Sequence, residues 1–457
     1  MSTFNTLPLS PALLQALETL TYTDMTPVQA ESLPAMLAGR DLIVQAPTGS
    51  GKTVAFGLCL LQQLDPAVMR VQALVLCPTR ELADQVAKEI RRLASAIQNL
   101  KVLTLTGGIA LGPQLASLRK DSHVIVGTPG RVQEMLRKKV LHLAGVRTLV
   151  LDEADRMLDM GFEEPIREIV GKTPPRRQSL LFSATYPEEI RAIGRSVLRD
   201  PLEVTVAGEA EQPAIDQFFF EVELARKPAA LAALLQDYRP ESSVVFCNTR
   251  RDADDVVEAL AKFGFSALAL HGDIDQRDRD EVLVRFANRS CSVLVASDVA
   301  ARGLDIKDLG AVINYELPPD PDIYLHRIGR TGRAGRSGLA LNLVTPREMP
   351  RAHALEKLHG EALRWKQPKV LAGKPQEAFL ATMVTLRIDA GRTDKMRPGD
   401  ILGALTGDAG LPADAVGKID VFATRCYVAI RRNEADKALH RLRAGKIKGR
   451  NVRVARI

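Results

Sequence analysis

The stretch DLIVQAPTGSGKT, residues 41–53, decides the class of fold. It begins with an apolar run of the length of a buried strand, passes through a glycine-rich loop, and opens a helical pattern. A strand that leads through such a loop into a helix is typical of a parallel α/β sheet, and the loop amides are suited to bind phosphate. A glycine loop with a purely structural role is the alternative.

Short apolar runs alternate with helical patterns through residues 40–345. The strands predicted in the first series are DLIVQA (41–46), ALVLCP (73–78), KVLTLT (101–106), HVIVGT (123–128), TLVLDE (148–153) and SLLFSA (179–184). After a polar bridge, those of the second series are SSVVFCN (242–248), SALALHG (266–272), CSVLVAS (291–297), AVINYE (311–316) and LALNLV (339–344). This alternation predicts two parallel-sheet domains, residues 1–207 and 215–365.

A third domain is predicted at residues 376–457, after a Pro-, Gly- and Lys-rich linker at residues 365–379. Its pattern reads strand, helix, strand, strand, helix, strand, the α+β order of ferredoxin-like RNA-recognition (RRM-like) domains. It holds 16 Lys and Arg against nine Asp and Glu, while residues 1–375 hold 46 of each, so it carries the whole net charge of +7. Such a surplus indicates a nucleic-acid binder, although a solvated basic surface is the alternative.

Three carboxylates, Asp152, Glu153 and Asp155, directly follow an apolar run at residues 149–151. Because burying a carboxylate is costly, a cation or a donor must compensate them. Helix capping is one explanation for acids at this place. Since parallel sheets bind ligands at the carboxyl ends of their strands, we instead expect the acids to face the phosphate loop. Thr53 and Asp152 would hold Mg²⁺ there, and Glu153 would activate the attacking water.

Ten motifs in order resemble those of the DEAD-box family of ATP-dependent RNA helicases, which is named for the tetrapeptide at residues 152–155. The matching segments are TYTDMTPVQ (21–29), APTGSGKT (46–53), PTREL (78–82), GG (107–108), TPGR (128–131), SAT (183–185), VVFCNT (244–249), HGDIDQRDR (271–279), SDVAARGLD (297–305) and HRIGRTGR (326–333). The resemblance implies two tandem RecA-like domains and ATP hydrolysis that RNA stimulates.

The resemblance also implies the residues of the ATP site. The cofactor-binding residues are Phe4, Gln29, Thr48, Gly49, Ser50, Gly51, Lys52, Thr53, Gly303 and Asp305. Phe4 would stack on adenine, Gln29 would read its edge, and Asp305 would contact the ribose. The implied catalytic residues are Lys52, Asp152, Glu153, Arg330 and Arg333. The two arginines would reach the γ-phosphate once the domains close; a solvated basic loop is the alternative for them.

RNA contacts follow from the same resemblance. In the two larger domains they are Arg80, Gly108, Thr128, Arg131, Thr249, Gly272, Arg279 and Ser297. Amides, hydroxyls and guanidinium groups would bind phosphates there, which makes this channel indifferent to base sequence. Ser183, Thr185 and His326 would couple hydrolysis to RNA binding, although small residues after a strand are equally common in turns.

The segments KMRPGDILGALTGDAGL (395–411) and GKIKG (445–449) resemble the C-terminal RNA-binding domain of a bacterial branch of this family. In strand 425–430, alternation places Cys426, Val428 and Ile430 inward and Arg425 and Tyr427 outward. Such domains usually present two or three aromatic rings for base stacking, whereas here only Tyr427 remains. We therefore expect recognition of folded RNA instead of general base stacking. The residues expected to bind are Arg387, Arg425, Tyr427, Lys446 and Lys448, although Tyr427 is also typical of an ordinary strand. The resemblance implies a hairpin of large-subunit ribosomal RNA as the target and ribosome assembly as the role.

The composition, 46% apolar and 26% charged, is that of a globular protein. No run approaches the ~18 apolar residues of a membrane span, so we expect a cytoplasmic protein. We also expect the protein to be a monomer. The five cysteines are scattered, which predicts neither a disulfide framework nor a zinc site. Two other functions stay open: an RNA clamp or chaperone that uses ATP with little unwinding, and a DNA translocase.

Overall fold

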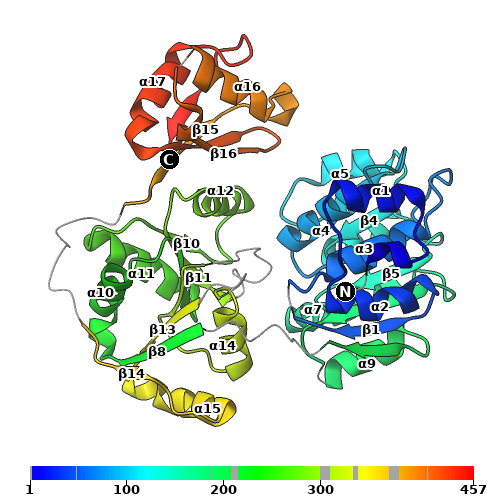
Figure 1. Cartoon of the computed structure of the whole chain (residues 1–457), viewed down its shortest axis with the longest axis horizontal. Helices are drawn as coiled ribbons and strands as arrows, with labels where there is room; N and C mark the ends of the chain where they lie inside the picture. The colour runs from blue at the N-terminus through cyan, green and yellow to red at the C-terminus, as the bar shows by residue number, and fades with distance from the viewer. Residues whose placement is uncertain are drawn as a thin grey trace. The chain divides into compact units, whose positions relative to one another are not determined.

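The structure is a computed structural model that describes residues 3–47, 49–186, 188–206, 215–298, 309–332, 338–369, 380–408 and 410–457. The chain divides into two compact units near residue 212. Each unit is described by itself. Figure 1 shows the strands and the helices that pack on them.

The first unit contains one seven-stranded sheet. Its strands are β1 (Leu42–Gln45), β2 (Ala73–Leu76), β3 (Val102–Leu105), β4 (Val124–Gly127), β5 (Thr148–Leu151), β6 (Gln178–Ser183) and β7 (Leu202–Thr205). They lie in the order β3-β4-β2-β5-β6-β1-β7, and every neighbouring pair is parallel. All carboxyl ends therefore meet at one edge, where the phosphate loop follows β1 and the acid cluster follows β5.

Helices cover both faces of this sheet. They are η1 (Phe4–Thr6), α1 (Pro11–Thr19), α2 (Pro27–Leu37), α3 (Lys52–Gln62), α4 (Arg80–Leu93), α5 (Leu111–Leu118), α6 (Pro129–Arg137), α7 (Ala154–Asp159), α8 (Glu163–Val170) and α9 (Glu188–Val197). Leu42 and Val44 pack with residues of α1 to α4, whereas Ile43 between them packs with residues of α6 to α9. Successive strand residues thus enter opposite cores, which explains why the strands are apolar throughout.

The second unit begins with another seven-stranded parallel sheet. Its strands are β8 (Ile215–Glu221), β9 (Ser243–Cys247), β10 (Ala267–Leu270), β11 (Val293–Ser297), β12 (Ala311–Asn314), β13 (Gly338–Val344) and β14 (Trp365–Lys366). Its helices are η2 (Leu224–Arg226), α10 (Lys227–Tyr238), α11 (Arg250–Lys262), α12 (Gln276–Ala287), α14 (Pro321–Ile328), η3 (Pro346–Glu348) and α15 (Met349–His359). Figure 1 shows α10 and α11 on one side of the sheet and α14 on the other.

The two sheets share one topology. The second runs β10-β11-β9-β12-β13-β8-β14, which is the first sheet's order when the strands of each are counted from its own start. The predicted tandem parallel α/β architecture is therefore confirmed. The sequence pattern missed β7, β8 and β14. Two of these are sheet edges with mostly exposed side chains, so they lack the continuous apolar run of a central strand.

The tail domain, residues 380–457, forms a four-stranded antiparallel sheet in the same unit. Its elements are β15 (Met383–Ile388), η4 (Arg392–Asp394), α16 (Pro398–Gly403), η5 (Ala404–Asp408), η6 (Ala413–Ala415), β16 (Val416–Val421), β17 (Cys426–Arg431), η7 (Arg432–Glu434), α17 (Ala435–Ala444) and β18 (Val454–Arg456). The sheet order is β16-β17-β15-β18. This confirms the predicted β-α-β-β-α-β plan.

In the described ranges, no helix is long and apolar enough to cross a membrane.

Candidate functional site

The phosphate loop joins β1 to α3 with two left-handed glycines. Gly49 and Gly51 have φ of +88° and +98°, which L side chains rarely adopt. A Cβ atom on Gly51 would also lie 2.6 Å from the Gln29 side-chain nitrogen. The Lys52 ammonium is buried and donates to the Ala46 carbonyl at 2.8 Å. Ser50 lies in this turn, while Thr48 lies outside the described residues.

Gln29, the predicted adenine reader, contacts this loop directly. Its Nε2 donates to the Gly51 carbonyl at 3.1 Å, and its Oε1 accepts from the Thr26 amide at 2.9 Å. The predicted base-reading residue is therefore bonded directly to the phosphate loop. Phe4 is buried in the core beside α1, at 3% exposure, so its stacking on adenine stays a prediction.

Asp152 follows β5 and is buried at the same sheet edge. Burial, partly offset by the nearby Lys52 ammonium, raises the pKa of Asp152 to about 7. A buried carboxylate with a high pKa is a group that a cation would stabilise in its charged form. In the described part of the chain no cluster of three or more His, Cys, Asp or Glu could hold a metal by itself. One carboxylate, the Thr53 hydroxyl and substrate phosphates nevertheless suit Mg²⁺, which prefers hard oxygen ligands and usually keeps some of its waters.

Glu153 lies next to Asp152 in a strained position. Its φ is +51°, in the left-handed region that non-glycine residues seldom adopt. Its carboxylate pairs with the Arg156 guanidinium at 2.5 Å, and both side chains are about nine-tenths buried. Backbone strain of this kind clusters at functional sites. The geometry fixes the Glu153 carboxylate at the end of β5, on the sheet edge that also carries the phosphate loop.

Asp155 contributes a link that the sequence analysis did not assign. Its Oδ2 accepts hydrogen bonds from the amides of Ala184 and Thr185, at 3.0 and 2.9 Å, and from the Thr185 hydroxyl at 3.1 Å. The acid cluster is thereby bonded to the predicted coupling segment after β6. Ser183 of that segment is fully buried, and its hydroxyl has no hydrogen-bond partner among the described residues.

The predicted RNA contacts of the first unit all follow strand ends. Arg80 begins α4 after β2, Gly108 follows β3 with φ of +73°, and Thr128 and Arg131 lie at the start of α6 after β4. Arg131 pairs with Glu134 at 3.1 Å and donates to the Ile109 carbonyl at 3.1 Å. The four predicted RNA contacts therefore lie at the sheet edge that carries the acids.

In the second unit the predicted RNA contacts also follow strand ends. Thr249 caps α11 after β9, and Ser297 ends β11. Gly272 and Arg279 lie in the turn after β10 and in the α12 helix that follows it, while His326 and Arg330 lie in and directly after α14. Gly303, Asp305 and Arg333 lie outside the described residues.

The outward face of the tail sheet is covered within the second unit. Cys426, Val428 and Ile430 enter the tail core as predicted. Tyr427, on the other face, is 2% exposed, and its hydroxyl lies 3.4 Å from a Glu281 oxygen on α12. Arg387 pairs with the same Glu281 at 3.8 Å.

Two further contacts join this face to the turn after α12. The Thr385 hydroxyl bonds to Asn288 at 2.9 Å and to Ser290 at 2.7 Å. Arg425 pairs with Asp389 at 3.5 Å. The sequence pattern identified which side chains leave the tail core but could not show what covers them. RNA binding by Arg387, Arg425 and Tyr427 stays a prediction.

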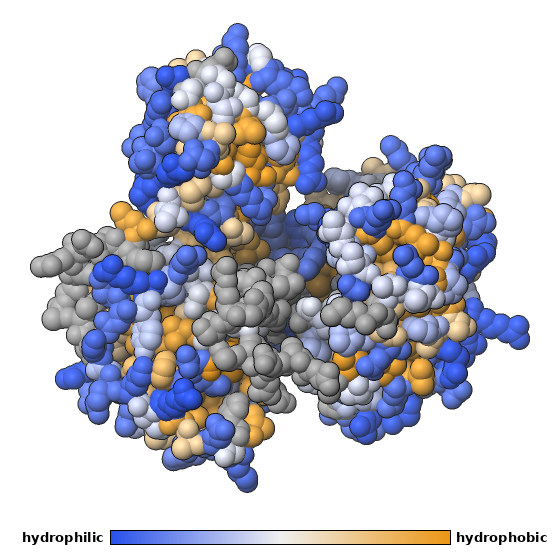
Figure 2. All heavy atoms as spheres, viewed as in Figure 1, coloured by the Kyte–Doolittle hydropathy of each residue, from blue (hydrophilic) through white to orange (hydrophobic). Residues whose placement is uncertain are grey.

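A second basic surface of the tail is open to solvent. Exposed basic side chains lie on and after α17, namely Lys437, Arg441, Arg443, Lys446, Lys448 and Arg450. Figure 2 shows hydrophilic residues along this side of the tail domain. Lys448 donates to the Lys395 carbonyl and pairs with Asp400, whereas Lys446 is simply exposed. Exposed basic side chains of this kind are suited to contact phosphates.

Comparisons with known proteins agree with this geometry. Family models match at residues 26–193 (DEAD/DEAH box helicase), 226–335 (helicase conserved C-terminal domain) and 385–456 (DbpA RNA binding domain). The chain belongs to the DEAD-box family of ATP-dependent RNA helicases, whose members hydrolyse ATP and bind RNA.

Within that family the chain is of the DbpA type. It is 53% identical to the ATP-dependent RNA helicase DbpA of Escherichia coli K12 over 99% of this chain and 98% of the relative. It is 46% identical to the DEAD-box ATP-dependent RNA helicase CshA of Bacillus cereus over 78% of this chain and 68% of the relative. A solved structure of Dbp5 from S. cerevisiae, bound to RNA and ADP BeF3, matches 80% of this chain and 96% of its own at 30% identity, with a TM-score of 0.73.

Proposed function

We propose that this helicase remodels a hairpin of large-subunit ribosomal RNA during ribosome assembly in the cytoplasm, acting as a monomer. The observation that carries this proposal is the tail, which matches the DbpA RNA-binding domain and holds the whole net charge of the chain. A basic recognition domain beside a channel that grips any RNA would supply the choice of substrate.

In the proposed chemistry the first unit binds ATP. Gly49 and Gly51 would turn their amides toward the phosphates, and Lys52 would leave the Ala46 carbonyl to reach them. Thr53 and Asp152 would hold Mg²⁺, which neutralises developing charge on the phosphate oxygens. Glu153 would orient the attacking water and accept its proton.

Arg330 from the second unit would complete the reaction. An arginine delivered to the γ-phosphate stabilises transition-state charge and is worth about 10³–10⁵ in rate in comparable NTPases. Asp155 would report the state of the nucleotide to the Ser183–Thr185 segment through its three hydrogen bonds. The family match favours neither of the two alternatives, an RNA clamp or chaperone that uses ATP with little unwinding and a DNA translocase.

The test compares ribosomal RNA that contains the hairpin with unrelated RNA of equal length as activators of ATP turnover. We expect the full chain to prefer ribosomal RNA, and a chain that ends at Pro375 to lose the preference. Loss of the tethered tail should raise the half-activating RNA concentration ~10²-fold. The full-length variant Lys446→Ala/Lys448→Ala, beside the control Lys418→Ala on β16, reports the same effect without truncation. An unchanged preference in the shortened chain would place selectivity in the two larger domains.

A further inference from the structure

A buried ion pair lies in the second unit, apart from every residue predicted to bind ATP or RNA. Lys227 begins α10 and Glu348 ends η3, and the Lys227 ammonium lies 2.8 Å from the Glu348 carboxylate. The Lys227 side chain is 1% exposed and that of Glu348 is 10% exposed. Burying two charges is costly and seldom adds net stability, so their other contacts need an explanation.

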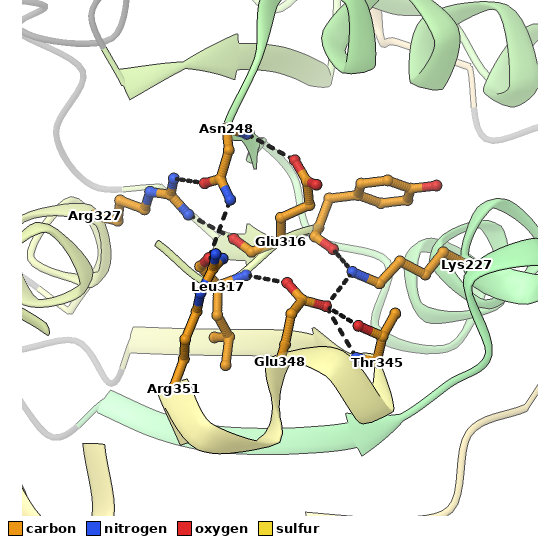
Figure 3. Close-up of polar contacts among 9 residues, drawn as sticks. Lys227, Asn248, Glu316, Leu317, Arg327, Thr345, Glu348 and Arg351 are labelled. Atoms are coloured by element: carbon orange, nitrogen blue, oxygen red, sulfur yellow. Dashed lines mark hydrogen bonds and ion pairs between the residues drawn. The ribbon is translucent and has the colours of Figure 1, made fainter. Parts of the chain in front are cut away.

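Both charges hold the chain segment that follows β12, residues 315–317. The Lys227 ammonium donates to the Tyr315 carbonyl at 2.6 Å, and the other Glu348 oxygen accepts from the Leu317 amide at 2.9 Å. Figure 3 shows these bonds converging on the segment from α10 and from the turn after β13. The Thr345 amide and hydroxyl also donate to Glu348, at 3.0 and 2.7 Å, which fixes its carboxylate.

The segment in turn holds Asn248. The Asn248 amide donates to the Glu316 carboxylate at 2.8 Å, and its side chain donates to the Leu317 carbonyl at 3.1 Å. Asn248 immediately precedes Thr249, whose hydroxyl caps α11. The position of this predicted RNA contact is thus set by the segment that the ion pair fixes.

The same segment holds Arg327. Its Nη1 donates to the Glu316 carbonyl at 2.7 Å, and its Nη2 donates to the Asn248 side-chain oxygen at 2.9 Å. Its Nε and Nη2 also form a two-pronged pair with Asp298, each bond being 2.7 Å long. Arg327 is 2% exposed, so it anchors α14 rather than contacting a ligand. Arg330, the predicted finger, follows three residues later.

We propose that Lys227 and Glu348 are positioning residues for RNA-stimulated ATP hydrolysis. The pair fixes residues 315–317, and this segment fixes both the turn that carries Thr249 and the helix that leads to Arg330. RNA contact and the arginine finger are thereby held in one rigid network on the second unit. The inference rests on the proposed role of Arg330. Lys227 and Glu348 are too buried to touch either ligand.

The experiment measures four quantities in the full chain: melting temperature, affinity for a fluorescent ATP analogue, half-activating RNA concentration, and RNA-saturated kcat. Lys227→Met removes the ammonium but keeps the length of the side chain. The matched control is Leu235→Ala, a buried residue of the same helix that has no polar link to residues 315–317. Both variants should melt at lower temperature than the wild type, because one loses a buried charge partner and the other gains a cavity.

We expect Lys227→Met to lower kcat by about 10- to 100-fold with nucleotide affinity unchanged, since a misplacement of about 1 Å at a reacting group can cost ~10²-fold. Leu235→Ala should keep kcat within about twofold of wild type, as expected for a change remote from the site. Equal kcat in the two variants, measured well below both melting temperatures, would make the pair a stability feature and overturn the proposal.

Two variants keep the test decisive if Lys227→Met does not fold. Asn248→Ala cuts the network at its half-buried centre and should lower kcat in the same way; a wild-type kcat there would overturn the proposal. Adding whichever network variant folds to Arg330→Ala should lower kcat little further, because the network is proposed to act through this arginine. If Arg330→Ala alone keeps wild-type turnover, the proposed finger fails. If Arg330→Ala is inactive while the network variants are active, only the present inference fails.

Discussion

Replacing Glu153 with glutamine tests the proposed general base most directly. The amide keeps the shape of the carboxylate and can still accept a hydrogen bond from Arg156, but it cannot take a proton from water. Loss of a general base costs about 10²–10⁴-fold in rate, so RNA-saturated kcat should fall by that factor. Nucleotide affinity should change little, because the phosphate loop, Gln29 and Asp152 are untouched.

The structure also sets the expected loss of stability. The Glu153 and Arg156 side chains meet at 2.5 Å and are 9% and 10% exposed. The variant replaces the ion pair by a hydrogen bond from the still-charged Arg156 guanidinium to a neutral amide oxygen, a loss of about 1–2 kcal/mol. For a unit of this size each kcal/mol corresponds to about 2–4 °C, so the melting temperature should fall by about 2–8 °C and the protein stays folded at 25 °C.

The assay is ATP turnover at saturating RNA, with binding of a fluorescent ATP analogue measured in parallel. Glu163→Gln is the matched control, because Glu163 on α8 also pairs with an arginine, Arg167, at 2.6 Å but is half-exposed and away from the strand ends. Turnover of Glu153→Gln within about twofold of the control would refute the role of Glu153 as base, since removal of a general base lowers the rate by at least about 10²-fold.

Three further results are expected. Arg330→Ala should abolish RNA-stimulated turnover but leave RNA affinity without nucleotide unchanged; equal loss of both would make Arg330 an RNA ligand. Thr185→Val removes one of the bonds to Asp155, so it should lower the free energy of unfolding by up to about 1.5–3 kcal/mol and reduce RNA unwinding more than ATP turnover; equal reduction would exclude coupling through this bond. Burial raises the pKa of Glu348, but Lys227 and Thr345 outweigh it and leave the pKa below its ordinary value of 4.5. The stability that this ionised group contributes is present above pH 4.5 and is lost as pH falls through the lower folded pKa. The difference in melting temperature between wild type and Glu348→Gln should therefore become smaller in acid. A difference that stays constant from about pH 7 to 3.5 would contradict the charged state of the pair.

Much of the architecture was predictable from local pattern. Every strand predicted in the two larger domains is present, because apolar runs this short, bounded by turn residues and alternating with helical patterns, are typical of buried parallel strands. The phosphate loop and the acid cluster were predicted to lie at one sheet edge because parallel strands share their carboxyl ends. The β-α-β-β-α-β order of the tail followed in the same way from residue alternation.

Long-range partners were decided by the tertiary structure alone. Nothing in the local sequence states that Gln29 bonds to Gly51, that Asp155 bonds to Thr185, or that Lys227 pairs with Glu348 across 121 positions of chain. Tyr427 was correctly placed outside the tail core, yet Glu281 on another domain covers it. Periodicity reports whether a side chain faces a core, because that depends on neighbours a few residues away. Which polar group it meets depends on how distant segments pack, and that is determined by the topology of the whole unit.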